Sequence, residues 1–289
     1  MPRLFNSFNN PPAPEHNIKN LSKKFETFTE ADERRNAVVR LLVSGSQSDL
    51  QIAKKIIQCR KGRRCLSSAC PICRRGMRTW FVGALLKAFE GVPNEQMTSL
   101  TILSANLQYG PGQIQNSQPR NAVNRLTAKL KRSSFTDEVI VGALDYDWCV
   151  RDNECCEGYW QVHYHLISVN LSETQIEKLR SAFPNQPNAY IRQAVDTKPI
   201  NDRVAQFSYV LKPFFQKRSS YLGSDGLRRT KKQPIKNAER HRELLRHLDQ
   251  HPLTESLVFY HARREGGVIR RTIPIVDDKF RRSVSETTE

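Results

Sequence analysis

The chain has 289 residues, which is enough for one large domain or two ordinary ones with a packed core. Lysine and arginine number 46, and aspartate and glutamate number 29, so the formal net charge is +17. A charge of this size predicts a polyanionic partner, most often nucleic acid. The sequence contains no apolar run near the ~18 residues that a membrane span needs, and its N-terminus lacks the apolar region of a signal peptide. We therefore expect a cytoplasmic protein rather than a secreted or membrane protein.

The sequence divides into five segments of different composition. Residues 1–20 and 280–289 are polar, and we expect them to be disordered tails. Between them the sequence predicts a helical region with a cysteine cluster at 21–93, a compact core at 94–217, and a basic segment with a C-terminal hairpin at 218–279.

Hydrophobic periodicity predicts alternating helices and strands. Apolar residues at helical spacing, with a capping box at Ser172, predict helices at 24–42, 49–57, 75–89, 121–132, 172–183 and 202–217. Alternating and β-branched runs predict strands at 98–104, 139–148, 159–169 and 190–197, and a terminal hairpin formed by 256–260 and 268–276. Between residues 98 and 197 the order is therefore β-α-β-β-α-β. This order predicts an α+β fold whose antiparallel sheet has both helices on one face and leaves the other face open to a ligand.

Four cysteines with the spacing C-x5-C-x4-C-x2-C lie ahead of the predicted core, namely Cys59, Cys65, Cys70 and Cys73. Two close pairs of thiolates can supply the four ligands of a closed, structural Zn²⁺ site. We expect nearby cations to lower the thiol pKa values, namely Lys61, Arg63, Arg64, Arg74 and Arg75. The alternative is a cluster of free thiols, because C-x5-C is looser than the usual first pair. The three other cysteines, Cys149, Cys155 and Cys156, are interpreted as incidental, and an odd total does not favour a disulfide framework.

The predicted strand 159–169 contains two histidines two residues apart, so His163 and His165 lie on one face. Two such imidazoles form a natural pair of ligands for one divalent cation, although two exposed histidines are the simpler alternative. A third ligand is expected from the partner strand. If the hairpin turns near residue 154, Asp145 lies opposite His163, and Asp147 is the alternative. Two imidazoles with one carboxylate suit Mg²⁺ or Mn²⁺ that must hold a phosphate.

The predicted helix 202–217 places Gln206, Tyr209 and Lys212 on one face, before Pro213 interrupts the pattern. A helical tyrosine is most often a packing residue. A tyrosine with a lysine one turn later can also be a nucleophile whose ionised form the ammonium stabilises.

These motifs in this order resemble the HUH endonuclease superfamily. The order is a strand with threonines (TSLTIL from Thr98), His-x-His at His163 and His165, and Tyr-x-x-Lys from Tyr209. A cysteine cluster ending in Cys-Pro-x-Cys ahead of the first strand strengthens the resemblance, and residues 142–145 are similar to the stretch that carries an acidic metal ligand. The chain is most similar to rolling-circle replication initiators of small plasmids and to related transposases, over roughly residues 59–217.

The resemblance implies a site-specific nickase that acts on single-stranded or hairpin DNA at an origin, with host replication proteins as further partners. Mg²⁺ or Mn²⁺ on Asp145, His163 and His165 would polarise the scissile phosphate. Tyr209 would attack, giving a 5′-phosphotyrosine and a free 3′-OH for rolling-circle replication, with Lys212 holding the phosphate or the phenolate. Plasmid initiators often carry a glutamate four residues before the tyrosine, where this chain has Ala205. The choice between plasmid initiator and transposase or mobilisation enzyme therefore stays open.

The basic segment after residue 217 is expected to bind DNA phosphates, in particular through Arg228, Arg229, Lys231 and Lys232. Tyr159 and the pair Phe214 and Phe215 are candidates for base stacking, although the phenylalanines are equally well explained as core residues. The alternative function is a catalytically inactive, zinc-containing DNA-binding regulator.

Overall fold

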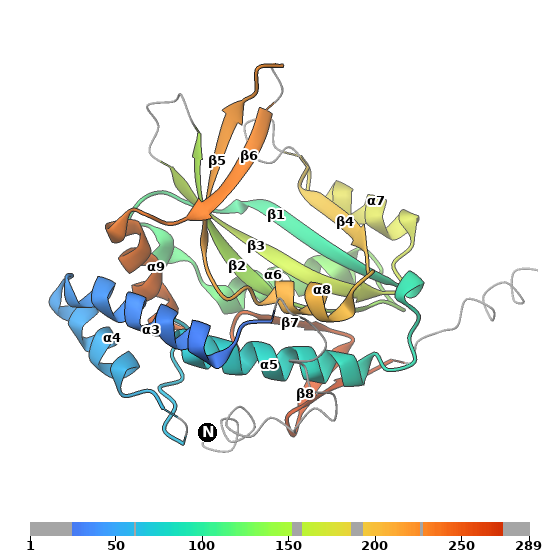
Figure 1. Ribbon diagram of the computed structural model, residues 1–289. Helices are drawn as coiled ribbons and strands as arrows, with labels where there is room; N and C mark the ends of the chain where they lie inside the picture. The colour runs from blue at the N-terminus through green and yellow to red at the C-terminus, as the bar shows by residue number, and fades with distance from the viewer. Residues whose placement is uncertain (1–24, 61, 152–157, 186–192, 226–227, 274–289) are drawn as a thin grey trace, which may run out of the picture.

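The computed structural model describes residues 25–60, 62–151, 158–185, 193–225 and 228–273. Both predicted tails lie outside these ranges, as do Cys155 and Cys156. The described part is an α+β fold in which helices surround one mixed sheet (Figure 1).

Seven strands form the sheet. In spatial order they are β4 (Val195–Pro199), β1 (Met97–Tyr109), β3 (Tyr159–Val169), β2 (Val139–Arg151), β5 (Gln216–Leu222) and β6 (Arg228–Pro234), with β7 (Leu257–Tyr260) also paired to β2. Neighbours among the first four are antiparallel, whereas β5 runs parallel to β2. Helix α6 (Pro119–Arg132) connects β1 to β2, and α7 (Glu173–Ala182) connects β3 to β4. The predicted β-α-β-β-α-β order is therefore present within a larger sheet.

The two faces of β3 pack against different helices. Apolar residues that include Trp160 and Tyr164 share a core with α6 and α7. On the other face, Ile167 and Val169 share a core with α5 (Pro71–Ala88) and α8 (Arg203–Val210). Figure 1 shows α5 and α8 along this side of the sheet. The expectation that this face is open is therefore wrong where α5 and α8 cover it.

The helix predicted at 202–217 ends at Val210, and the chain enters β5 at Gln216. Pro213 lies in the connection, where its missing N–H and fixed φ do not continue a helix. Lys212 is therefore two residues beyond the helix rather than one turn along it.

The predicted terminal hairpin pairs differently from our expectation. Strand β7 joins β2 in the main sheet, and a hairpin forms between β8 (Ala262–Glu265) and β9 (Val268–Arg271). His261 has a φ of 48°, which turns the chain between β7 and β8, and Gly266 and Gly267 form the tight turn with positive φ. The strand predicted at 190–197 is observed as β4, and residues 190–192 lie outside the described part.

Three of the described helices precede the sheet, and the sequence explains where each begins. Capping boxes at Thr27 and Ser46 start α3 (Phe28–Val43) and α4 (Gln47–Ile57), so the first helix begins four residues later than predicted. Helix α5 begins at Pro71, four residues earlier than predicted, because proline is favoured in a first helical turn. Its first turn therefore contains Cys73 as well.

Helix α9 (Ala238–Gln250) buries His247, whose Nε2 lies 3.3 Å from the Tyr146 hydroxyl. Burial, together with nearby His251, lowers the pKa of His247 to about 3. The folded protein thus keeps this imidazole neutral at mildly acidic pH, where the unfolded chain protonates it.

We expect acid to destabilise the protein partly through His247. Below pH ~6.5 the unfolded state binds a proton that the folded state excludes, so stability falls as pH falls. Between pH 7.5 and pH 5 this residue should account for about 2 kcal/mol of lost unfolding free energy. Urea unfolding of the wild type and His247→Gln at both pH values measures this term, and equal pH dependence in the two proteins would contradict it.

Candidate functional site

The pairing of β2 with β3 sets the centre of the site. Asp145 lies directly opposite His163, as the strand register predicted from the sequence requires. The Nε2 atoms of His163 and His165 are 3.0 Å apart. Asp145 Oδ2 lies 3.6 Å from Nε2 of His163 and 3.5 Å from Nε2 of His165. Three ligand-type atoms from two adjacent strands therefore converge on one point.

Hydrogen bonds on the outer side of each imidazole orient the ring nitrogens. His163 Nδ1 lies 3.3 Å from the carbonyl oxygen of Gln161, which can only accept, so Nδ1 carries the hydrogen. His165 Nδ1 lies 3.1 Å from Oγ1 of Thr101, the residue opposite it on β1. With Nδ1 as the donor, the Nε2 lone pair of each neutral ring points inward toward Asp145.

Burial keeps both imidazoles neutral and available as ligands. His163 and His165 are almost fully buried, and burial lowers the pKa of each, to about 3 for His165. Adjacent ligands of an ion bound at about 2.1 Å lie roughly 3.0–3.5 Å apart, which the observed spacings match. Asp145, His163 and His165 can therefore hold a metal ion.

Lys212 compensates the charge of the buried carboxylate. Its Nζ lies 2.5 Å from Asp145 Oδ2, and both side chains are 3% exposed. Burial opposes ionisation of Asp145, but the Lys212 ammonium and the two imidazoles together hold its pKa well below the usual range. Burial likewise opposes the charge on Lys212, but Asp145 raises its pKa. Lys212 is thus an ion-pair partner of the carboxylate, a role that its predicted position in a helix had not suggested.

Asp147, the alternative third ligand, has another partner. Its Oδ2 lies 3.7 Å from His163 Nε2, but the carboxylate accepts a hydrogen bond from Arg218 of β5. The convergent group of ligand atoms contains Asp145 and not Asp147.

The structure brings Tyr209 to this group. Its ring centroid lies 4.9 Å from that of His165, and Lys212 Nζ lies 4.9 Å from the Tyr209 centroid. The side chain is 39% exposed, so the hydroxyl faces solvent rather than an apolar core. Lys232 Nζ of β6 donates to the Tyr209 hydroxyl over 3.2 Å.

The contact of Lys232 with Tyr209 is a feature that the sequence did not reveal. Lys232 was predicted only as a DNA-binding residue, because local alternation on β6 does not show which strand or helix lies beside it. Arg229 and Lys231 of the same strand are exposed, and the side chain of Arg228 lies outside the described part.

The aromatic residues proposed for stacking have different environments. Phe214 is 46% exposed, whereas Phe215 packs edge-on against Tyr146 and beneath Arg74. Tyr159 is half-buried in β3 opposite Cys149. Phe214 therefore remains a candidate for stacking, and Phe215 belongs to the core.

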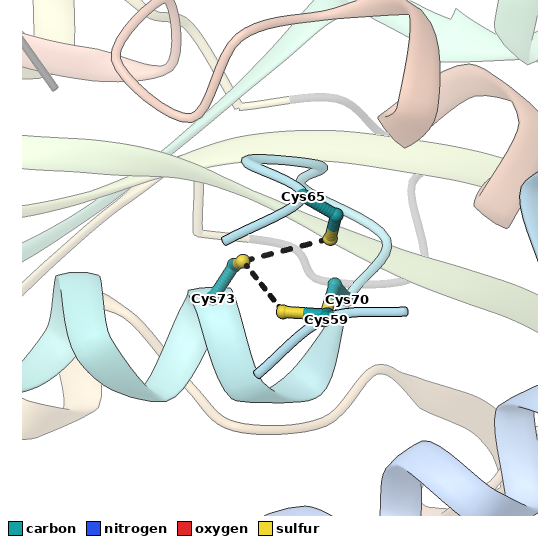
Figure 2. Close-up of side chains that lie close together, drawn as sticks. All are labelled: Cys59, Cys65, Cys70 and Cys73. Atoms are coloured by element: carbon teal, nitrogen blue, oxygen red, sulfur yellow. Dashed lines mark hydrogen bonds between the residues drawn. The ribbon is translucent and has the colours of Figure 1, made fainter. Parts of the chain in front are cut away.

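The four clustered cysteines form the second candidate site. All four sulfurs lie within 4.8 Å of one another, and Cys73 Sγ is 3.6 Å from the sulfurs of Cys59 and Cys65 (Figure 2). Sulfurs bound to one Zn²⁺ at about 2.3 Å would lie about 3.8 Å apart, so the cluster fits a tetrahedral site. Cys70 is the N-cap of α5, and Cys73 follows in its first turn. A metal here would join the 59–65 loop to the start of α5.

The thiol pKa values shift mainly through the thiols themselves. Hydrogen bonds from the other three cysteines lower the pKa of Cys59. Hydrogen bonds within the same cluster raise the pKa values of Cys70 and Cys73. The expectation that the thiol pKa values are lowered is therefore wrong for Cys70 and Cys73, and the largest cause at each of the four thiols is another cysteine. Cys149 is buried in β2 and is not part of the cluster.

Comparison of the chain with protein-family models, with curated proteins and with solved structures finds no match. Among the described helices, none combines the length and apolar character needed to cross a membrane. The chemistry of the site therefore has to indicate the function.

We expect the cysteine cluster to bind zinc. Protein purified under reducing conditions should contain about one Zn²⁺ per chain, because four sulfurs form a closed site. Cys73→Ser should lose most of this zinc and melt at a lower temperature, whereas Cys149→Ser should retain the zinc. Elemental analysis measures the content, and a wild type that is folded and stable without zinc would contradict the assignment.

Mn²⁺ binding should distinguish the two aspartates of β2. Asp145→Asn removes an expected ligand and should weaken Mn²⁺ binding by at least about 10-fold, as loss of a metal-site carboxylate does. Asp147→Asn alters the partner of Arg218 rather than a member of the convergent ligand group, and should weaken Mn²⁺ binding less than Asp145→Asn does. Electron paramagnetic resonance of free Mn²⁺ measures both, and equal losses in the two variants would refute the distinction.

Proposed function

We propose that the protein is a replication initiator-type DNA nickase that cleaves single-stranded DNA by metal-assisted tyrosine transesterification. One observation carries the proposal: the partly exposed phenol of Tyr209 packs edge-on against His165, beside the convergent ligand atoms of Asp145, His163 and His165. A nucleophile next to a cation site is the arrangement that phosphoryl transfer needs.

The residues around Tyr209 suit attack on a phosphodiester. A divalent cation bound to Asp145, His163 and His165 would draw electron density from the scissile phosphate. The Tyr209 oxygen forms a bond to phosphorus as it gives up its proton, and the bond from phosphorus to the 3′-oxygen breaks. The 3′-oxygen takes up a proton and leaves as a free 3′-OH. No net bond energy is lost, because a phosphotyrosine ester replaces the phosphodiester.

Two ammonium groups lie beside the nucleophile. Lys232 Nζ is within hydrogen-bond distance of the Tyr209 hydroxyl, so it can stabilise negative charge on that oxygen directly. Lys212 is buried and keeps Asp145 ionised, and its charge lies against the Tyr209 ring. We therefore assign the direct contact with the attacking oxygen to Lys232 and the support of the metal-binding carboxylate to Lys212.

The surroundings of Tyr209 fit a polymeric, anionic substrate. Strands β5 and β6 project from the main body of the sheet (Figure 1), and the exposed Arg229 and Lys231 lie on β6. A phosphate chain passing Tyr209 would meet these cations, and its affinity should fall steeply with salt. Phe214, exposed in the connection before β5, can stack a base.

A DNA-binding regulator without catalysis is the second candidate, and the surroundings of Ala205 favour it. Ala205 provides no carboxylate at the position where many initiators carry glutamate. The amide of neighbouring Gln206 bonds to the backbone at Asn201, Asp202 and Pro199 instead of facing Tyr209. The absence of a glutamate at Ala205 also suits a transposase or mobilisation enzyme that uses one tyrosine.

A nicking assay with matched tyrosine variants tests the proposal. With Mn²⁺ and a library of single-stranded and hairpin DNA, the wild type should form a covalent adduct that survives denaturation. Tyr209→Phe should form none, because it lacks the attacking oxygen. Tyr221→Phe alters an exposed tyrosine of β5 and should form the adduct normally. DNA binding without an adduct in the wild type, or an adduct that survives in Tyr209→Phe, would reject the proposal.

The two lysines of β6 provide a finer test. Lys232→Ala should slow adduct formation by about 100-fold, as loss of one donor to a developing oxyanion does. Lys231→Ala, which alters the adjacent and exposed cation, should weaken binding and its salt dependence but leave the rate at saturating DNA within about threefold. Equal rate losses in both variants would show that Lys232 acts only through general charge.

A further inference from the structure

The helix that carries Tyr209 cannot hold its own position. Helix α8 has eight residues, which is too short to be stable by itself. The last carbonyls of a helix have no partners within it, and Pro213 follows soon after Val210 without an N–H to offer. The orientation of Tyr209 must therefore depend on contacts from other elements.

Two arginines of α5 supply those contacts on both sides of Tyr209. Arg78 Nε donates to the carbonyl of Ser208 over 3.1 Å. Arg74 Nη2 donates to the carbonyl of Lys212 over 2.9 Å. Arg74 and Arg78 are four residues apart, so they lie on one face of α5. The guanidinium groups thus hold the residue before Tyr209 and the lysine that pairs with the metal-site carboxylate.

The two guanidinium groups are themselves held in place. Arg78 is 5% exposed, and its guanidinium lies 4.6 Å above the Phe25 ring. Arg74 lies 4.4 Å above the Phe215 ring. At the other end of α8, Arg203 Nη1 donates to the carbonyl of Phe89 at the end of α5. Helix α8 is therefore fixed to α5 at both ends.

The same part of α5 begins in the cysteine cluster. Cys70 is its N-cap, Cys73 lies in its first turn, and Arg74 is the next residue. A metal bound to these sulfurs would fix the turn from which Arg74 projects, with Arg78 one turn later. The cluster is thereby connected to the Tyr209 segment through one rigid helix and two hydrogen bonds.

We propose that Arg74 and Arg78 are positioning residues that couple the cysteine cluster to Tyr209, so that metal on the cluster sets the geometry of the nucleophile. The effect on rate rests on the proposed function, but the coupling itself is a structural property. A displacement of about 1 Å at a nucleophile can cost about 100-fold in rate, so loss of the coupling should slow the reaction strongly.

Amide hydrogen exchange in α8 measures the coupling without any assay of activity. In Arg78→Gln and Arg74→Gln, amides of residues 204–212 should exchange about 10-fold faster or more, because a hydrogen bond from a charged donor is lost. Arg78→Lys, which keeps a donor and its charge, should restore part of the protection. Arg75→Gln is the matched control, since Arg75 Nε donates to the carbonyl of Glu26 and not to α8. Its α8 exchange should equal that of the wild type.

Removal of the cluster metal by a chelator should raise exchange in the same segment, with the arginines intact.

In the nicking assay, Arg78→Gln should lower the adduct rate at saturating DNA by about 10- to 100-fold and leave DNA affinity within about twofold. Unchanged α8 exchange in Arg78→Gln, or the same change in Arg75→Gln, would overturn the proposal. If Arg74→Gln does not fold, hydrogen exchange of α8 in Arg78→Gln and after metal removal tests the coupling instead. If the wild type forms no adduct, the proposed nickase function is rejected, but the hydrogen-exchange experiment still tests the coupling.

Discussion

The antiparallel pairing of β2 with β3 is the constraint on which the site depends. Because opposite residues in such a pair lie within about 5.5 Å, the register brings Asp145 to His163 without any contribution from loops. A shift of one residue would turn the histidines to the face that packs on α6 and α7. The large aromatic residues of that face, Trp160 and Tyr164, resist such a shift, so the core itself maintains the site.

Burial explains why this arrangement favours a cation. Two neutral imidazoles direct lone pairs at the same point, and an ionised carboxylate lies beside them at 3% exposure. Lys212 compensates the charge of the buried carboxylate, and the three convergent ligand atoms could also hold a metal ion. Tyr209, which is 39% exposed, lies against the ring of His165, so a partly exposed phenol adjoins this buried group.

The sequence predicted local features well and long-range contacts poorly. Asp145 opposite His163 followed from counting residues back from a hairpin, and the cysteine cluster followed from spacing. The end of α8 was misplaced, because the predicted helix was extended past Pro213 to residue 217, whereas it ends at Val210. The parallel pairing of β5 with β2 depends on residues about 70 positions apart, which no local period encodes. The contacts of Lys232 and Arg74 with the Tyr209 segment are invisible for the same reason.

Anomalous diffraction from crystals grown with Mn²⁺ tests the central claim most directly. We expect one strong peak bonded to the side chains of Asp145, His163 and His165, with the Tyr209 hydroxyl on its open side. A peak that lies elsewhere, or no peak while Lys212 still occupies Asp145, would contradict the account.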